Sequence, residues 1–291
     1  MDCSDCFFLG NKNEQSNEDT TEINYSMKSE NWHEDFMQYA DLHSKTEGKS
    51  QIIALIDSGI SEFQENKVDK NYNMISSEDV YDENGHGTMM CSLIIGGEGL
   101  QGISPQTKIY SYKVVDKSGK VTPEILADAI DKAVKDNVTI INISLGSYFD
   151  NKRIKESVKG AIESGIIVVA SSGDYETEDM LYPAKYNNCI SVGAIDENIH
   201  VWKKTNAKDQ CDILAPGVDI NTILNTGELE KTNGTSQSTA LISGYIALIK
   251  DYARMCDIDI KTSQIKKILI DINNKKISYL EGLNRIEEYT N

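Results

Sequence analysis

Ser236 is the residue whose surroundings in this sequence best suit chemistry at a hydroxyl group. It follows the small residues Asn233-Gly234-Thr235 and begins an apolar-periodic stretch that predicts a helix. Because backbone N–H groups without helical partners collect at the start of a helix, negative charge that develops beside Ser236 would meet hydrogen-bond donors there. A simple helix cap has the same pattern, so other residues must decide between the two interpretations.

A nucleophilic serine needs a neutral imidazole that takes its proton and a carboxylate that orients the imidazole. Of the 4 histidines in the sequence, His86 is flanked on both sides by glycine, which lets other backbone come close. The other three, His33, His43 and His200, are expected to be solvated or to cap helices. The pattern therefore singles out His86 as the candidate base.

The candidate carboxylate, Asp57, directly follows a continuous apolar run at residues 51–56 that predicts a buried parallel strand. The expected elements after it are strands over residues 108–115, 138–143 and 166–170, and helices over residues 89–95, from Pro123 to Val134 and over 152–164. This alternation predicts an α/β fold, doubly wound in three layers around a mainly parallel central sheet. Ligands of such folds bind beyond the carboxyl ends of the strands, where Asp57 is expected.

The two ends of the chain have less distinct patterns. Residues 1–25 are polar and acidic without apolar periodicity, so we expect disorder or loose docking there and a single domain over residues 26–291. Residues 32–42 predict one short amphipathic helix. Near the C-terminus, residues 262–272 predict a helix, and Gly282-Leu283 predicts a closing turn.

Composition excludes several classes of protein. A formal net charge of −17 argues against nucleic-acid binding, because such a surface repels phosphates. No apolar run is long enough for a membrane span, and the acidic N-terminus does not resemble a secretory signal, so we expect a cytoplasmic protein. The 6 cysteines are then expected to be reduced thiols.

Three motifs carry a resemblance to a known family. Ile56-Asp57-Ser58-Gly59, His86-Gly87-Thr88 and Asn233-Gly234-Thr235-Ser236, in that order, resemble the signatures of the subtilisin-like serine proteases, the subtilases of peptidase family S8. Residues 141–146, the turn Tyr182-Pro183-Ala184 and residues 214–217 resemble further segments of the family. The resemblance covers about residues 30–288. It implies a subtilisin-like fold with a cis peptide bond before Pro183.

The resemblance also implies roles for individual residues. Asp57 would orient His86, His86 would act as general base and then as general acid, and Ser236 would attack the scissile carbonyl. The substrate would pair as an extended strand with two edges of the protein. The residues expected to bind the substrate are Lys120, Val121, Ser144, Leu145, Gly146, Ser172, Gly173, Tyr175 and Leu181. Since many relatives have glycine at the position of Leu181, and Tyr175 is expected at the rim, we predict a narrowed pocket before the scissile bond.

Asp174 departs from the family pattern, which places asparagine at this oxyanion-hole position beside the Ser236 backbone. An ionised Asp174 has no proton to donate and would repel the oxyanion. Three interpretations follow: the carboxyl is held neutral, the Ser236 N–H alone stabilises the oxyanion and turnover is slow, or the protein is a non-catalytic relative. The intact Asp-His-Ser set favours an enzyme.

No metal or other cofactor is expected, because residues 94–102 look shorter than the calcium-binding loop of secreted relatives and Asn66 stands where those use an aspartate. The expected partner is a peptide or protein substrate, and the expected state is a monomer. Among subtilases the chain most resembles the cytoplasmic peptidases that remove the leader from lanthipeptide (lantibiotic) precursors. The alternatives are an intracellular subtilisin for general protein turnover and a catalytically silent subtilase that binds peptides.

Overall fold

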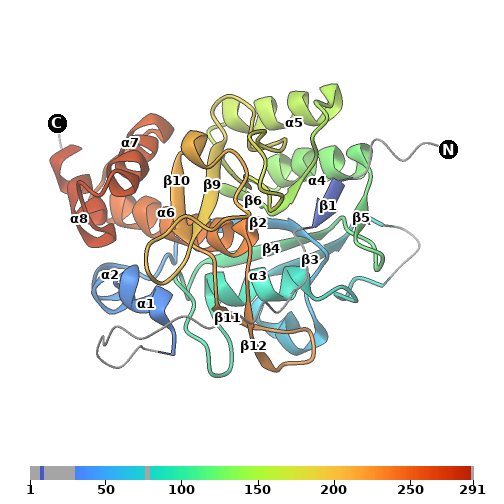
Figure 1. The fold of residues 1–291 in the computed structure, drawn as a ribbon, viewed down its shortest axis with the longest axis horizontal. Helices are drawn as coiled ribbons and strands as arrows, with labels where there is room; N and C mark the ends of the chain where they lie inside the picture. The colour runs from blue at the N-terminus through green and yellow to red at the C-terminus, as the bar shows by residue number, and fades with distance from the viewer. Residues whose placement is uncertain (1–6, 10–29, 76–78, 290–291) are drawn as a thin grey trace.

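A seven-stranded parallel sheet forms the centre of the computed structural model, which describes residues 7–9, 30–75 and 79–289 (Figure 1). In spatial order its strands are β10 (Ile213–Pro216), β9 (Ile190–Ile195), β8 (Ile167–Ser171), β6 (Ile140–Ile143), β2 (Ile52–Asp57), β4 (Lys108–Lys113) and β3 (Lys70–Asn73). Every neighbouring pair is parallel. The predicted doubly wound α/β fold is confirmed.

Helices cover both faces of this sheet, because its central strands are apolar on both sides. On one face, Ile53 and Leu55 of β2 pack in the same core as α3 (His86–Ile95) and α6 (Thr235–Met255). On the other face, Ala54 and Ile56 pack with α4 (Pro123–Lys135) and α5 (Lys152–Glu163). The result is three layers, with α4 and α5 above the sheet in Figure 1 and α3 below it.

The position of β2 in the sheet determines where a ligand can bind. From β2 the chain passes to β3 and β4 on one side and later to β6, β8, β9 and β10 on the other. The connections on the two sides therefore diverge at the carboxyl end of β2, which is where folds of this kind bind ligands. Asp57 is the last residue of β2.

A two-stranded hairpin positions the start of α6. Its strands are β11 (Ile220–Ile223) and β12 (Leu229–Thr232), which pair antiparallel. The chain then turns at Gly234, whose N–H donates to the carbonyl oxygen of Gly217 at 2.8 Å. Most of the 21 residues of α6 are buried, so this helix runs through the core rather than along the surface.

Two predictions about short helices were wrong. Residues 32–42 do not form one helix but α1 (Trp32–Phe36) and α2 (Tyr39–Lys45), separated at Gln38, whose φ of 61° interrupts the helical conformation. Gly282 lies inside α8 (Tyr279–Asn284) and not in a turn. A Cβ atom on Gly282 would lie 2.5 Å from the hydroxyl oxygen of Tyr245, so this glycine permits close packing of α8 on α6.

The remaining elements complete the molecule. The predicted helix at 262–272 is confirmed as α7 (Thr262–Asn273). Short 3₁₀ helices lie at Glu62–Lys67, Lys208–Gln210 and Arg285–Tyr289. The four described cysteines, Cys91, Cys189, Cys211 and Cys256, are free thiols as predicted, whereas Cys3 and Cys6 lie outside the described residues. Within the described ranges, no helix has both the length and the apolar character needed to cross a membrane.

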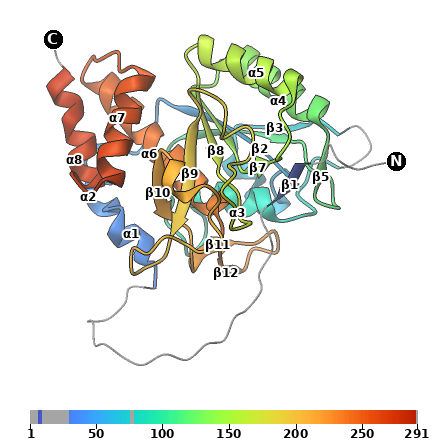
Figure 2. The same cartoon turned by 45° about the horizontal axis from the view of Figure 1, so that its top comes forward.

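A second, three-stranded sheet includes a segment that the sequence did not reveal. Strand β1 (Phe7–Leu9) lies between β5 (Lys120–Val121) and β7 (Leu145–Gly146) and pairs antiparallel with both (Figure 2). The sequence predicted disorder or loose docking over residues 1–25 and no strand there; at these three positions the segment is docked as a strand. The rest of that segment lies outside the described residues.

His33 is buried in α1, contrary to the prediction of a solvated or capping side chain. Its ring packs edge-on against Tyr39, and neither ring nitrogen has a hydrogen-bond partner. Burial lowers the pKa of His33 to about 4, although nearby Asp35 acts in the opposite direction. The histidine is therefore neutral in the folded protein over a pH range where it is charged in the unfolded chain.

Acid conditions are expected to destabilise the protein through His33. Because the unfolded state binds a proton near the ordinary histidine pKa and the folded state does not, the free energy of unfolding falls as the pH drops. Between about pH 7.5 and pH 5.0 this loss should be about 2 kcal/mol. The free energy of unfolding of His33→Phe, measured by urea unfolding, should fall less than that of wild type between these two pH values, by that amount. His200→Phe, which changes an exposed histidine, should retain the wild-type dependence; equal slopes in all three proteins would contradict the assignment.

Candidate active site

The end of β2 and the start of α3 bring Asp57 and His86 together. The Nδ1 atom of His86 lies 2.8 Å from Asp57 Oδ1 and 3.0 Å from Oδ2, and both side chains are buried. Burial lowers the pKa of His86, but the charge and hydrogen bond of Asp57, together with the charges of Asp82 and Asp174, raise it by more, so the pKa lies above its ordinary value. The sequence-based pairing of these two residues agrees with this geometry.

Main-chain contacts fix the separation of the two elements. The N–H of Gly87 donates to Ser58 Oγ at 2.8 Å. A Cβ atom on Gly87 would lie only 2.2 Å from the carbonyl oxygen of Gly59, so any larger residue would push α3 away from the end of β2. Glycine at position 87 therefore allows the backbone that carries His86 to approach the backbone that carries Asp57.

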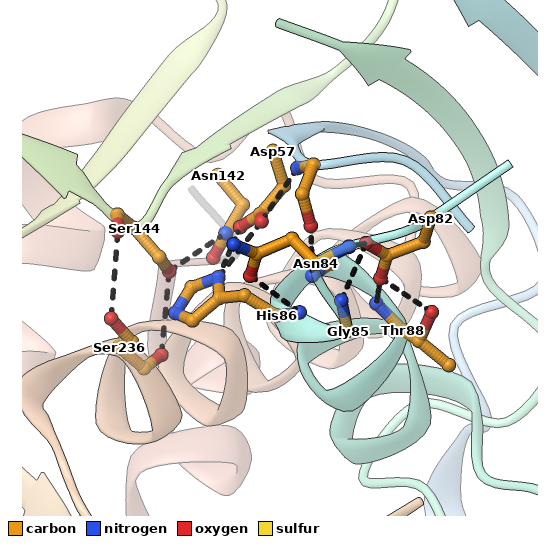
Figure 3. A network of polar contacts seen from close by, with 11 residues as sticks. Asp57, Asp82, Asn84, Gly85, His86, Thr88, Asn142, Ser144 and Ser236 are labelled. Carbon is orange, nitrogen blue, oxygen red and sulfur yellow. Dashed lines mark hydrogen bonds and ion pairs between the residues drawn. The ribbon is translucent and has the colours of Figure 1, made fainter. Parts of the chain in front are cut away.

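Asp82 is a supporting residue that the sequence analysis missed. Its carboxylate accepts hydrogen bonds from the N–H groups of Gly85 and Thr88 at 2.7 and 2.9 Å, and from Thr88 Oγ1 at 2.6 Å (Figure 3). These contacts satisfy the N–H of Thr88 in the first turn of α3 and that of Gly85 directly before the helix. An aspartate three residues before the glycine that begins a helix is the signal that could have identified it.

Ser236 lies at the start of α6, across from the end of β6. Its Oγ donates to the carbonyl oxygen of Ser144 at 3.5 Å, and Ser144 Oγ donates to the Ser236 carbonyl oxygen at 3.4 Å. Figure 3 shows the ring of His86 between Asp57 and Ser236, with Nε2 on the side of Ser236. Nε2 is buried and has no hydrogen-bond partner, so it is free to accept a proton.

Asp174 is buried and contacts the residue before Ser236. Its Oδ1 accepts hydrogen bonds from the N–H and the Oγ1 of Thr235 at 2.9 and 2.6 Å. Burial raises the pKa of Asp174 above its ordinary value, although the Thr235 hydrogen bonds and the charge of His86 act in the opposite direction. The sequence analysis placed Asp174 near the nucleophile but missed Thr235 as its partner.

The predicted substrate-binding residues lie in two groups. Lys120 and Val121 form β5, and Leu145 and Gly146 form β7, directly after Ser144. Beside Ser236, a small cavity is lined in part by Gly173, Tyr175 and Leu181. Ser172 is buried and is not among the residues that line this cavity; its carbonyl oxygen accepts a hydrogen bond from the N–H of Leu181 at 3.0 Å. The peptide bond between Tyr182 and Pro183 is cis, which confirms that prediction.

This arrangement has the parts required for acyl transfer. A carboxylate holds one nitrogen of an imidazole, the other nitrogen is free and faces a serine hydroxyl, and the serine N–H lies in the first turn of a helix, where no earlier carbonyl is available to it. A backbone N–H of this kind can donate to an oxyanion. The site can therefore support attack of Ser236 on a carbonyl carbon.

Two named bacterial proteases are similar in sequence to part of this chain. The chain is 33% identical over 208 residues to the minor extracellular protease Epr of Bacillus subtilis (strain 168), a match that covers 70% of this chain and 32% of Epr. It is 35% identical over 182 residues to the major intracellular serine protease of the same organism, covering 60% of this chain and 57% of that protein. The chain thus spans from about a third to somewhat over half the length of these relatives.

The fold and the family follow from two further comparisons. The solved structure of the prenylagaramide maturation protease PagA superimposes with a TM-score of 0.73 at 23% identity, covering 87% of this chain and 99% of PagA, which shows the same fold. The sequence model of the subtilase family, peptidase S8, matches residues 48–284. That match includes the strand that ends at Asp57, the helix that begins at His86 and the helix that carries Ser236. The chain therefore belongs to the subtilase family.

Proposed function

We propose that the protein is a serine endopeptidase in which Asp57, His86 and Ser236 form the catalytic triad. The observation that carries this proposal is the buried Asp57–His86 pair, whose second ring nitrogen is unpartnered and faces Ser236. A pair of this kind stabilises the imidazolium that forms when the serine proton is transferred. Family membership and the named proteases among the relatives agree with it.

The reaction proceeds in two steps. Ser236 Oγ attacks the carbonyl carbon of the scissile bond while its proton moves to His86 Nε2. The oxyanion that forms accepts a hydrogen bond from the N–H of Ser236. The C–N bond then breaks as His86 returns the proton to the leaving amine, which leaves an acyl group on Ser236. Water attacks this ester with His86 again as base, releasing the new carboxyl group and restoring the serine.

We further propose that the substrate is the leader segment of a modified lantibiotic precursor, cleaved at one bond inside the cell. Two features support a selective enzyme over a digestive one. The cavity beside Ser236 is small, which excludes most side chains, and Asp174 occupies the position where an oxyanion donor is expected, which lowers turnover. The similarity to an intracellular serine protease supports the location and also favours the second candidate, general protein turnover.

Incubation with two substrates tests this proposal. The purified full chain should cut a lanthipeptide precursor encoded next to its gene at one bond between leader and core, and should leave casein intact. Mass spectrometry of the products measures both outcomes, and Ser236→Ala serves as the control for contaminating proteases. Extensive digestion of casein would instead establish the turnover function. Precursor that stays intact, with casein also intact, would contradict leader removal.

A further inference from the structure

The cavity beside Ser236 is nearly filled by one side chain. Its volume is about 10 Å³, roughly the space of a single water molecule. Leu181 is buried and reaches both walls of the cavity, since a Cβ atom on Gly146 would lie 2.6 Å from Leu181 Cδ1 and one on Gly173 would lie 2.8 Å from the same atom. Gly146 and Gly173 both line the cavity, and Leu181 occupies the space that side chains at these two positions would need.

Strand β1 shows how an extended peptide is aligned with this cavity. Phe8 pairs with Gly146 and Leu9 with Leu145, antiparallel to β7, while Phe8 also pairs with Lys120 of β5. The next position in this register is opposite Ser144, whose carbonyl oxygen lies 3.5 Å from Ser236 Oγ. A peptide bound in the same register therefore places its following residue beside Ser236 and the cavity.

We propose that the enzyme cleaves after glycine or alanine, and that Leu181 is the residue that sets this specificity. This inference rests on the proposed endopeptidase activity and adds the class of bond that is cut. A glycine or alanine at the position before the scissile bond fits a cavity of this size, whereas leucine or phenylalanine would overlap Leu181. Exclusion of a larger side chain from a tightly packed pocket changes kcat/KM by about 100-fold or more.

A peptide series tests the proposal on the full-length protein. The substrates are Phe-Phe-Leu-Xaa-Asn-Lys peptides in which Xaa is glycine, alanine, leucine or phenylalanine. Wild type should cleave the glycine or alanine peptide at least about 100-fold faster, in kcat/KM, than the phenylalanine peptide. In Leu181→Ala, this preference should shift toward leucine and phenylalanine by about tenfold or more. Equal cleavage of all four peptides by wild type, or an unchanged ratio in Leu181→Ala, would overturn the proposal.

The ratio of kcat/KM values between peptides separates a change in specificity from a loss of stability. Leu126→Ala removes a buried leucine from α4, outside the site, and should lower the melting temperature without changing the ratio between peptides. Peptidyl phosphonates that end in the glycine or phenylalanine analogue give a second readout, because they react with the serine even if turnover is slow. Faster inactivation by the phenylalanine analogue would overturn the proposal. If the glycine peptide is cleaved but no lanthipeptide precursor is, the proposal of leader processing is contradicted while the role of Leu181 in specificity is supported.

Discussion

Replacing Ser236 with alanine will abolish labelling by a fluorophosphonate probe and lower peptide hydrolysis by roughly 10⁶-fold, the effect known for the triad serine of subtilisin, a member of the same family. The physical reason is that Ser236 lies at the start of α6, on the side of the unpartnered His86 nitrogen that would take its proton. In-gel fluorescence and a peptide assay measure the two effects.

A serine two residues away gives a matched control. Ser238 lies in the same helix, and its Oγ donates to the carbonyl oxygens of Ala215 and Pro216, both at 2.9 Å, so it faces away from His86. Ser238→Ala should be labelled at the wild-type rate. If wild type is not labelled at any pH, the protein is not a serine peptidase, and the catalytically silent peptide-binding alternative is supported.

Asp174→Asn is expected to raise kcat by about tenfold or more. The amide oxygen of asparagine can keep both hydrogen bonds from Thr235, while its NH₂ group supplies a donor that an ionised carboxylate lacks. A missing donor at this position costs about 10²–10³ in rate, as known for subtilisin. Burial raises the pKa of Asp174, so its protonated, donating form persists to higher pH than that of an ordinary aspartate and is lost as the pH rises further. The advantage of the variant in kcat should therefore grow as the pH rises.

Asp174→Ala separates the donor from the charge. It removes the negative charge without adding a donor and also leaves Thr235 without its acceptor, so its kcat should stay below that of Asp174→Asn at every pH. A drop of 100-fold or more in Asp174→Asn would show that the carboxyl group itself takes part in the reaction. The pH profiles of kcat for the three proteins measure this difference.

The sequence was sufficient where local patterns determine the structure. The apolar run before Asp57 predicted a buried strand, and the glycines around His86 predicted a close backbone approach that the contact between Gly87 and Gly59 explains. Because a doubly wound sheet collects its strand ends at one edge, the strand pattern placed Asp57 at that edge, and the family resemblance supplied its pairing with His86.

The features that were missed depend on contacts between distant parts of the chain. The partner of Asp174 is Thr235, 61 residues later, and no local pattern connects them. Strand β1 has only three residues, and its pairing depends on β5 and β7, more than a hundred residues away. His33 has the polarity of a surface residue, and only the packing around α1 buries it. Tertiary packing overrides local preference at each of these positions.

The placement of β1 makes peptide binding an exchange rather than an addition. In the structure, the main-chain groups of β5 and β7 already pair with Phe7–Leu9, so an incoming peptide that uses these edges replaces existing hydrogen bonds with equivalent ones. The net gain from backbone pairing is then close to zero, and the free energy of binding depends on how the side chains of the guest differ from those of the resident strand. A generic extended chain gains little from this exchange, so the equilibrium itself discriminates between sequences before any bond is cut.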